Sequence, residues 1–160
     1  MQSKGMLELH LHKYSKMIKI ALDRVQGDYG FEAYDAEGHV VKIDGSEAIG
    51  GTGFGVRPMQ LLLMGLGGCS AIDIISILKK QRETVEDFSI HLEGEREPGK
   101  EPSLWKNVHI VFILKGNIDP AKVTKACALS MEKYCSVAET LKKGGTLLTW
   151  ESRVEPVSTN

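Results

Sequence analysis

Residues 51–80, GTGFGVRPMQLLLMGLGGCSAIDIISILKK, decide the fold of this chain. The stretch begins as a glycine-rich turn, and after Pro58 it becomes an apolar segment that two lysines close. Proline suits the first turn of a helix, where its missing N–H costs no hydrogen bond. Within residues 61–78 the only ionisable side chains are Cys69 and Asp73. A helix that is apolar on every side must be buried on every side, so we expect the rest of the chain to wrap around it.

The apolar run is about as long as a membrane span, but its composition argues against one. Asp73 lies near its middle, three glycines interrupt it, and the chain has no second hydrophobic segment. An Asp at mid-bilayer costs about 2.5 to 3.5 kcal/mol on insertion scales. We therefore predict a core helix and no membrane partner.

Gly65, Gly67 and Gly68 each weaken helix propensity by about 1 kcal/mol relative to Ala. They indicate either a close approach of another backbone or an interruption of the helix just before Cys69. In the second case Cys69 would begin a new helix, where free N–H groups and the helix dipole stabilise a thiolate.

The remaining sequence predicts two groups of strands and a second helix. Alternating apolar and polar residues predict strands at 17–26, 29–36, 39–44, 85–95, 105–115 and 146–156. Asp119 and Pro120 predict the start of a helix that runs from about 121 to 143, and Gly144 and Gly145 predict its end. This order predicts one α+β domain, residues 1–160, in which antiparallel sheet covers a central helix.

Composition excludes several classes of function. Lysine and arginine number 20 and aspartate and glutamate 21, so no basic field recruits nucleic acid. Three cysteines, without an export signal in the sequence, predict free thiols in the cytoplasm. The run GGTGFG at 50–55 does not meet the pattern of a dinucleotide-binding loop, and no phosphate-binding loop motif occurs. His10 and His12 would share one face of a strand, but no third ligand accompanies them, so no metal site is predicted.

Cys69 and Cys135 are the candidates for chemistry, because each lies in a long predicted helix and the two helices can pack together. A thiolate that attacks a peroxide becomes a sulfenic acid, and a second cysteine within reach condenses with it to a disulfide. The alternative is that both are small apolar side chains in a core, where free cysteine is common. Spacing alone leaves both interpretations open.

Residues 51–80 and residues 128–141, ALSMEKYCSVAETL, resemble the signature regions of the OsmC/Ohr family, the osmotically inducible protein C and organic hydroperoxide resistance proteins. The order of elements is similar over nearly the whole chain. The run CysSerAlaIleAsp at 69–73 looks most like the less characterised OsmC-like branch.

The resemblance implies an OsmC-like fold, with antiparallel sheets wrapped around long central helices in an intertwined homodimer. It also implies a thiol peroxidase, of peroxiredoxin-type activity in oxidative stress defence, that reduces organic hydroperoxides and is restored by a dithiol reductant. Cys69 would be the peroxidatic thiol and Cys135 the resolving thiol. No metal, flavin, haem or other cofactor is implied, and Cys127 matches no reactive position of the family.

One position departs from the family pattern. The hydroperoxidases carry a glutamate directly after the helix-opening proline, where it holds an arginine against the reactive thiolate, but this chain has Met59. Arg57 and Arg24 are candidates for the cation, and Glu47 for the acid. The departure supports a second hypothesis, a non-catalytic protein that binds a hydrophobic or thioester ligand in the groove of the dimer.

Overall fold

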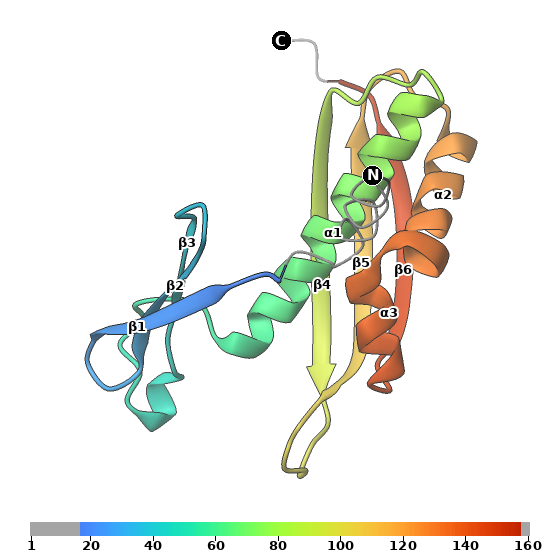
Figure 1. The fold of residues 1–160 in the computed structure, drawn as a ribbon. Coiled ribbons are helices and arrows are strands. Elements are labelled where there is room, and N and C mark those ends of the chain that lie inside the picture. The colour runs from blue at the N-terminus through green and yellow to red at the C-terminus, as the bar shows by residue number, and fades with distance from the viewer. Residues whose placement is uncertain (1–16, 158–160) are drawn as a thin grey trace, which may run out of the picture. The chain divides into compact units, whose positions relative to one another are not determined.

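The computed structural model describes residues 17–157, so His10 and His12 lie outside the described residues. In chain order the strands and helices are β1 (Ile20–Gln26), β2 (Gly30–Asp35), β3 (Val40–Ile43), α1 (Pro58–Lys80), β4 (Asp87–Arg96), β5 (Trp105–Lys115), α2 (Pro120–Leu129), α3 (Ser136–Lys143) and β6 (Leu147–Glu155) (Figure 1). The chain divides into two compact units, residues 1–58 and 59–160.

The first unit contains the predicted meander, β1-β2-β3, whose neighbouring strands pair antiparallel. Asp44, only 2% exposed, organises the glycine-rich segment that follows it. Its carboxylate accepts hydrogen bonds from the N–H groups of Thr52 at 2.8 Å and Phe54 at 3.0 Å. The Phe54 N–H is the largest of the interactions that hold the pKa of Asp44 below its ordinary value. At Gly55 a Cβ atom would lie 2.3 Å from the Lys42 carbonyl carbon, so only glycine permits this approach.

The sheet of the second unit has the order β4-β5-β6. The predicted hairpin β4-β5 is antiparallel, but β6 pairs with β5 in parallel. The prediction of wholly antiparallel sheet is therefore wrong at this last strand. Two helices, α2 and α3, connect β5 to β6, and a connection of that length carries the chain back to begin β6 at the same end as β5.

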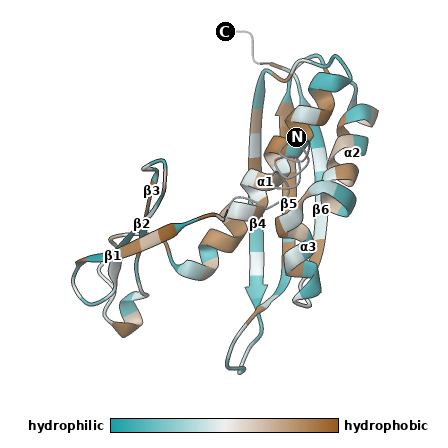
Figure 2. Cartoon of the chain, in the orientation of Figure 1, coloured by the Kyte–Doolittle hydropathy of each residue, from teal (hydrophilic) through white to brown (hydrophobic). Residues whose placement is uncertain are grey.

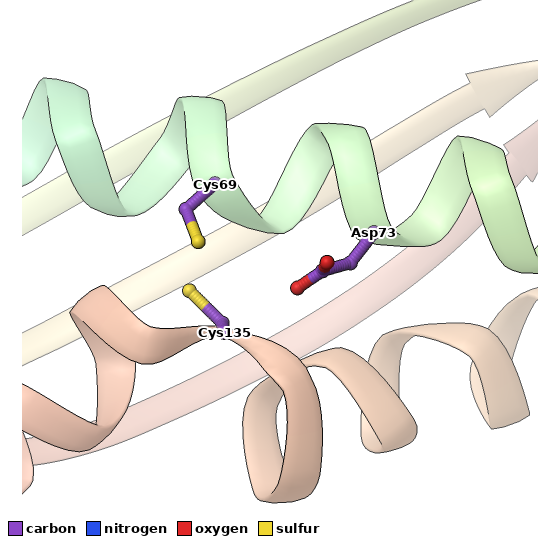
Figure 3. A group of neighbouring side chains, drawn as sticks. All are labelled: Cys69, Asp73 and Cys135. Carbon is purple, nitrogen blue, oxygen red and sulfur yellow. The ribbon is translucent and has the colours of Figure 1, made fainter. Parts of the chain in front are cut away.

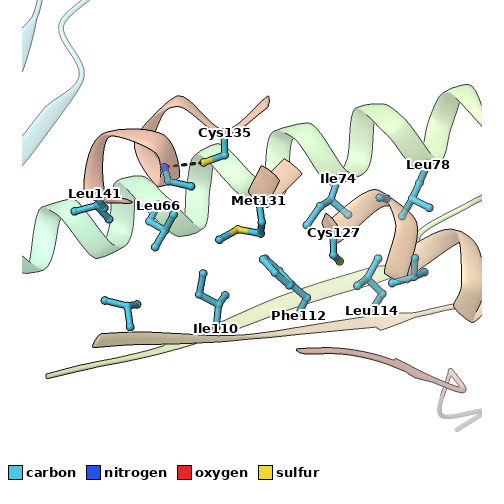
Figure 4. Packing of buried hydrophobic residues seen from close by; sticks show 14 of the residues in the cluster. Leu66, Ile74, Leu78, Ile110, Phe112, Leu114, Cys127, Met131, Cys135 and Leu141 are labelled. Carbon is cyan, nitrogen blue, oxygen red and sulfur yellow. Dashed lines mark hydrogen bonds between the residues drawn. The ribbon is translucent and has the colours of Figure 1, made fainter. Parts of the chain in front are cut away.

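The core of the second unit lies between this sheet and the helices. Alternate side chains of β5 are buried, as expected for a strand with one covered face. The buried side chains of α1 and β5 face each other (Figure 4): Leu66, Ile74, Leu78, Ile110, Phe112 and Leu114. Gly67 allows the helix to lie close to β4, because a Cβ atom there would already be 3.1 Å from Leu92 Cδ1.

Helix α1 is continuous from Pro58 to Lys80, so of the two alternatives for its glycines the interruption before Cys69 is wrong. Apolar segments recur along α1 (Figure 2), yet among residues 17–157 only one face of the helix is buried. Leu62, Met64 and Ile72 are 42%, 54% and 69% exposed. Burial on every side is therefore not achieved within one chain.

Among the helices of residues 17–157, α1 alone is long and apolar enough to cross a membrane by length and composition. In this fold its buried residues pack in the core with those of β5, and Asp73 is half-buried.

The predicted second helix, 121–143, is two helices. Asp119 caps α2 as predicted, since its carboxylate accepts a hydrogen bond from Ala121 N–H at 2.9 Å. After Leu129 the chain makes one wide π-helical turn, and at Cys135 the backbone is extended, with φ −71° and ψ 101°. Helix α3 starts immediately afterwards. The break therefore falls at the second candidate cysteine.

We predict that Asp44→Asn destabilises the first unit at neutral pH, because an amide is a weaker acceptor for the N–H groups that the carboxylate holds. A lowered native pKa means that the carboxylate stabilises the fold above its unfolded pKa of about 3.9, and that this contribution disappears as the pH falls through the native pKa. Urea unfolding and amide exchange at Thr52 and Phe54 should therefore differ between variant and parent at pH 7 and converge in acid. Asp28→Asn, at an exposed turn, is the control; an equal effect there would contradict the prediction.

Candidate active site

The fold of the second unit brings Cys69 and Cys135 together. The two sulfur atoms and a carboxylate oxygen of Asp73 all lie within 4.8 Å of one another, and both cysteines are free thiols. Figure 3 shows the sulfur of Cys69 directed from α1 towards that of Cys135, which lies between the π-helical turn and α3. A modest side-chain movement would allow the two sulfur atoms to bond.

Cys135 occupies the N-cap of α3. Its sulfur accepts a hydrogen bond from Ala138 N–H at 3.4 Å (Figure 4). Its own N–H donates to Ser130 O at 2.8 Å, which closes the π-helical turn. The helix terminus predicted for Cys69 is therefore found at Cys135. A signal for it exists in the sequence, since Ser136 with Glu139 three residues later has the pattern that often opens a helix.

The two thiols differ in exposure. Cys69 is half-buried, whereas Cys135 is 3% exposed. Burial raises the pKa of the Cys135 thiol above its ordinary value, and the neighbouring Cys69 adds to the increase. The raised pKa therefore favours the neutral thiol of Cys135, and the more exposed Cys69 lies beside it.

Ser70 is a residue of the site that the sequence analysis missed. It is fully buried, and its hydroxyl oxygen lies 2.8 Å from Leu66 O and 3.5 Å from Cys135 Sγ. A hydroxyl has one proton, and the short contact directs it to the Leu66 carbonyl. When the hydroxyl turns to Cys135 Sγ instead, it donates to the sulfur, and this hydrogen bond opposes the increase in the pKa of that thiol. Its place next to Cys69 in the sequence is the only signal that could have indicated this role.

Asp73 lies one helical turn beyond Cys69, as its spacing predicts. Because a carboxylate opposes a neighbouring thiolate, the sequence alone leads us to expect that Asp73 caps or bridges backbone elsewhere. That expectation is wrong, since the carboxylate lies beside both thiols and accepts a hydrogen bond from Ser130 Oγ at 3.1 Å. Within residues 17–157, the ion pairs of the structure do not include Asp73.

A pocket of about 370 Å³ adjoins this cluster. Asp73 belongs to the cysteine cluster and also lines the pocket. The other lining residues are Ser76, Ile77, Lys80, Gln81, Leu129 and Tyr134. The Oε1 atom of Gln81 is buried without a hydrogen-bond partner among the described residues. The pocket combines an apolar wall with several polar groups, which is the usual lining of a small-molecule site.

Cys127 and Met59 lie in the second unit but are not members of the cysteine cluster. Cys127 is fully buried in the core, and burial raises the pKa of its thiol to about 12. Met59 packs against the core, and its carbonyl accepts a hydrogen bond from Trp105 Nε1 at 3.1 Å. The remaining three candidates belong to the first unit: Arg24, Glu47 and Arg57.

Comparison with known proteins agrees with this architecture. The chain is 40% identical over 114 residues to protein YhfA of Escherichia coli K12, and the match covers 71% of this chain and 81% of that protein. A crystal structure of a hypothetical protein from Aquifex aeolicus has a TM-score of 0.73 and 29% identity, and covers 88% of this chain and 99% of its own.

A structure from Legionella pneumophila, described as an organic hydroperoxide resistance protein OsmC, has a TM-score of 0.67 and covers 89% of this chain and 100% of its own. Its identity is 19%, so it shows the shared fold alone. The family model described as OsmC-like protein matches residues 50–151, which include α1 and both candidate cysteines. The chain therefore belongs to the OsmC-like protein family.

Proposed function

We propose that this protein is a thiol peroxidase that reduces organic hydroperoxides through Cys69 and Cys135. The observation that carries the proposal is the approach of two free thiols within 4.8 Å at the middle of α1, with one half-buried and the other almost fully buried. The two sulfur atoms differ in exposure, and this difference suits different roles in the reaction. The more exposed sulfur of Cys69 reacts with the peroxide, and the buried sulfur of Cys135 reacts only with the sulfenic acid that Cys69 then carries.

The reaction has two balanced steps. The Cys69 thiolate attacks the outer oxygen of the hydroperoxide, the O–O bond breaks, and the alkoxide takes a proton and leaves as alcohol. Cys69 is then a sulfenic acid. The Cys135 sulfur attacks the Cys69 sulfur, the S–O bond breaks, and the hydroxyl leaves with the thiol proton as water. A dithiol reductant returns the resulting disulfide to two thiols.

The surroundings of Cys135 support its assignment as the resolving thiol. Its raised pKa keeps it protonated until Cys69 is oxidised, so it does not compete for peroxide. The Ala138 N–H at 3.4 Å fixes the position of its sulfur. Because Met59 cannot hold an arginine against Cys69, we expect turnover to be slower than in hydroperoxidases that carry the glutamate.

We propose that the active form is a homodimer in the cytoplasm, in which residues 1–160 form one domain. Leu62, Met64 and Ile72 expose apolar surface along α1, and a second chain would bury it. Among the described residues nothing lies within 4 Å of a Cβ built at Gly65 or Gly68. Both glycines therefore leave room for another backbone to approach.

The alternative, a non-catalytic protein that binds a hydrophobic or thioester ligand, is favoured by the pocket beside Asp73. A buried Gln81 Oε1 without a partner among the described residues is a site where a ligand donor would bind. On this interpretation the cysteines only pack, and a ligand should remain with the protein through purification.

We predict that one equivalent of cumene hydroperoxide removes two thiols per chain from the reduced protein, with the mass loss of a disulfide. Cys69→Ser should reduce peroxide consumption to the rate in buffer, because the attacking sulfur is gone. Cys135→Ser should stop at a sulfenic acid after one turnover. Intact mass and thiol counts measure each outcome.

Cys127→Ala is the control for this experiment, and it should behave as the parent because the Cys127 thiol is buried and protonated. If all thiols of the parent survive an excess of peroxide, the peroxidase proposal fails. Native mass spectrometry for a retained ligand then tests the alternative.

We also predict a solution mass of twice the 17.6 kDa chain, and that Ile72→Arg weakens association by at least about tenfold, because an arginine there would be buried without a partner. Light scattering over a concentration series measures both. Ala121→Arg, on the exposed side of α2, is the matched control. A parent that remains monomeric, or a control that dissociates equally, would contradict the homodimer.

A further inference from the structure

The peroxidase chemistry leaves the position of Asp73 unexplained. Its carboxylate lies with two thiols inside a cluster whose ligand atoms are within 4.8 Å of one another. The two steps proposed for Cys69 and Cys135 give this carboxylate no role. Two sulfur atoms and a carboxylate oxygen that converge on one point are, in contrast, a suitable ligand set for a metal cation.

We propose that Cys69, Asp73 and Cys135 form a binding site for a divalent cation of the zinc class. Two thiolates and one carboxylate suit Zn²⁺, whereas Mg²⁺ and Ca²⁺ prefer oxygen ligands alone. Tetrahedral zinc with Zn–S bonds of about 2.3 Å separates its sulfur ligands by roughly 3.8 Å. Because the ligand atoms lie within 4.8 Å of one another, no edge of the cluster needs to contract by more than roughly 1.3 Å to reach that geometry.

The hydrogen bonds around the cluster would orient two of its ligands. Ser130 Oγ donates to one oxygen of Asp73, which leaves the other oxygen available for the cation. Ala138 N–H holds the Cys135 sulfur, and this bond remains possible when the sulfur is a thiolate. Such second interactions fix the direction of metal ligands and strengthen the site. Cys69 and Asp73 are further constrained because both project from one turn of the rigid helix α1.

Access and coordination number also fit. Cys69 and Asp73 are half-buried rather than sealed, and the pocket that includes Asp73 offers a path for the cation. Three protein ligands leave a fourth position for water, as in open zinc sites. On binding, the two thiol protons pass to the buffer and no electron moves. The metal-bound pair and the Cys69–Cys135 disulfide therefore exclude each other, so the cation protects the reduced state.

Cobalt is a direct probe, because thiolate-bound Co²⁺ in a tetrahedral site absorbs light by charge transfer. We predict that the reduced parent, kept under nitrogen, binds one Co²⁺ per chain with this absorption, and that Zn²⁺ displaces it. Asp73→Asn should weaken Co²⁺ binding by at least about tenfold, although both thiols remain. Cys127→Ala should match the parent. Cys69→Ser and Cys135→Ser should each reduce the charge-transfer absorption.

The parent oxidised with diamide tests the site without a substitution, and it should not bind Co²⁺ until a dithiol restores the thiols. This sample decides the result if Asp73→Asn fails to fold, which circular dichroism would show. Absence of charge-transfer absorption at one equivalent, or unchanged affinity in a folded Asp73→Asn or in the oxidised parent, would overturn the proposal. Peroxide turnover is measured separately with a chelator present. Failure of metal binding is thereby distinguished from failure of the peroxidase activity.

Discussion

The contact between the middle of α1 and the break in the chain at Cys135 is the constraint on which the rest of the second unit depends. Leu66 and Ile74 press the helix onto β5, and Ser70 lies between them with its hydroxyl 3.5 Å from Cys135 Sγ. Because α1 cannot move along the sheet without losing this packing, Cys69 and Asp73 are held at fixed positions. The wide turn before Cys135 then supplies the second sulfur at the same level of the helix.

The break itself is stabilised by several hydrogen bonds. The N–H of Cys135 closes the wide turn on Ser130 O, and Lys142 Nζ donates to Met131 O at 2.8 Å. Wide turns of this kind inside helices are frequently found at functional sites. Here the turn directs Ser130 Oγ to Asp73 and places Cys135 at the start of α3. One local irregularity therefore positions both the Ser130 hydroxyl and the Cys135 sulfur at the cluster.

Much of this architecture could be predicted from the sequence, because local signals decide it. Pro58 and the terminal lysines mark the ends of α1, and Asp119 caps α2. The pairing direction of β6 could not be predicted, because it depends on how the preceding helices cross the sheet. The break at Cys135 was missed because residues 121–143 are nearly all compatible with a helix, which conceals a change in its hydrogen-bond pattern.

The chemistry of the site was only half predictable. The two cysteines were identified from their sequence contexts, but the position of the Asp73 carboxylate depends on which face of α1 meets the break. A carboxylate beside two thiols has no part in disulfide formation, but it can complete a set of metal ligands. The same three side chains can therefore support disulfide formation in one state and metal binding in the other.

The claim that Cys69 and Cys135 form one reactive pair is tested most directly by mapping disulfides after mild oxidation of the reduced protein with diamide. Diamide does not depend on recognition of a peroxide, so the result reports the geometry alone. The account predicts one linkage, Cys69 to Cys135 within a chain, with Cys127 still free. A linkage that includes Cys127, a bond between chains, or the survival of both thiols would contradict it.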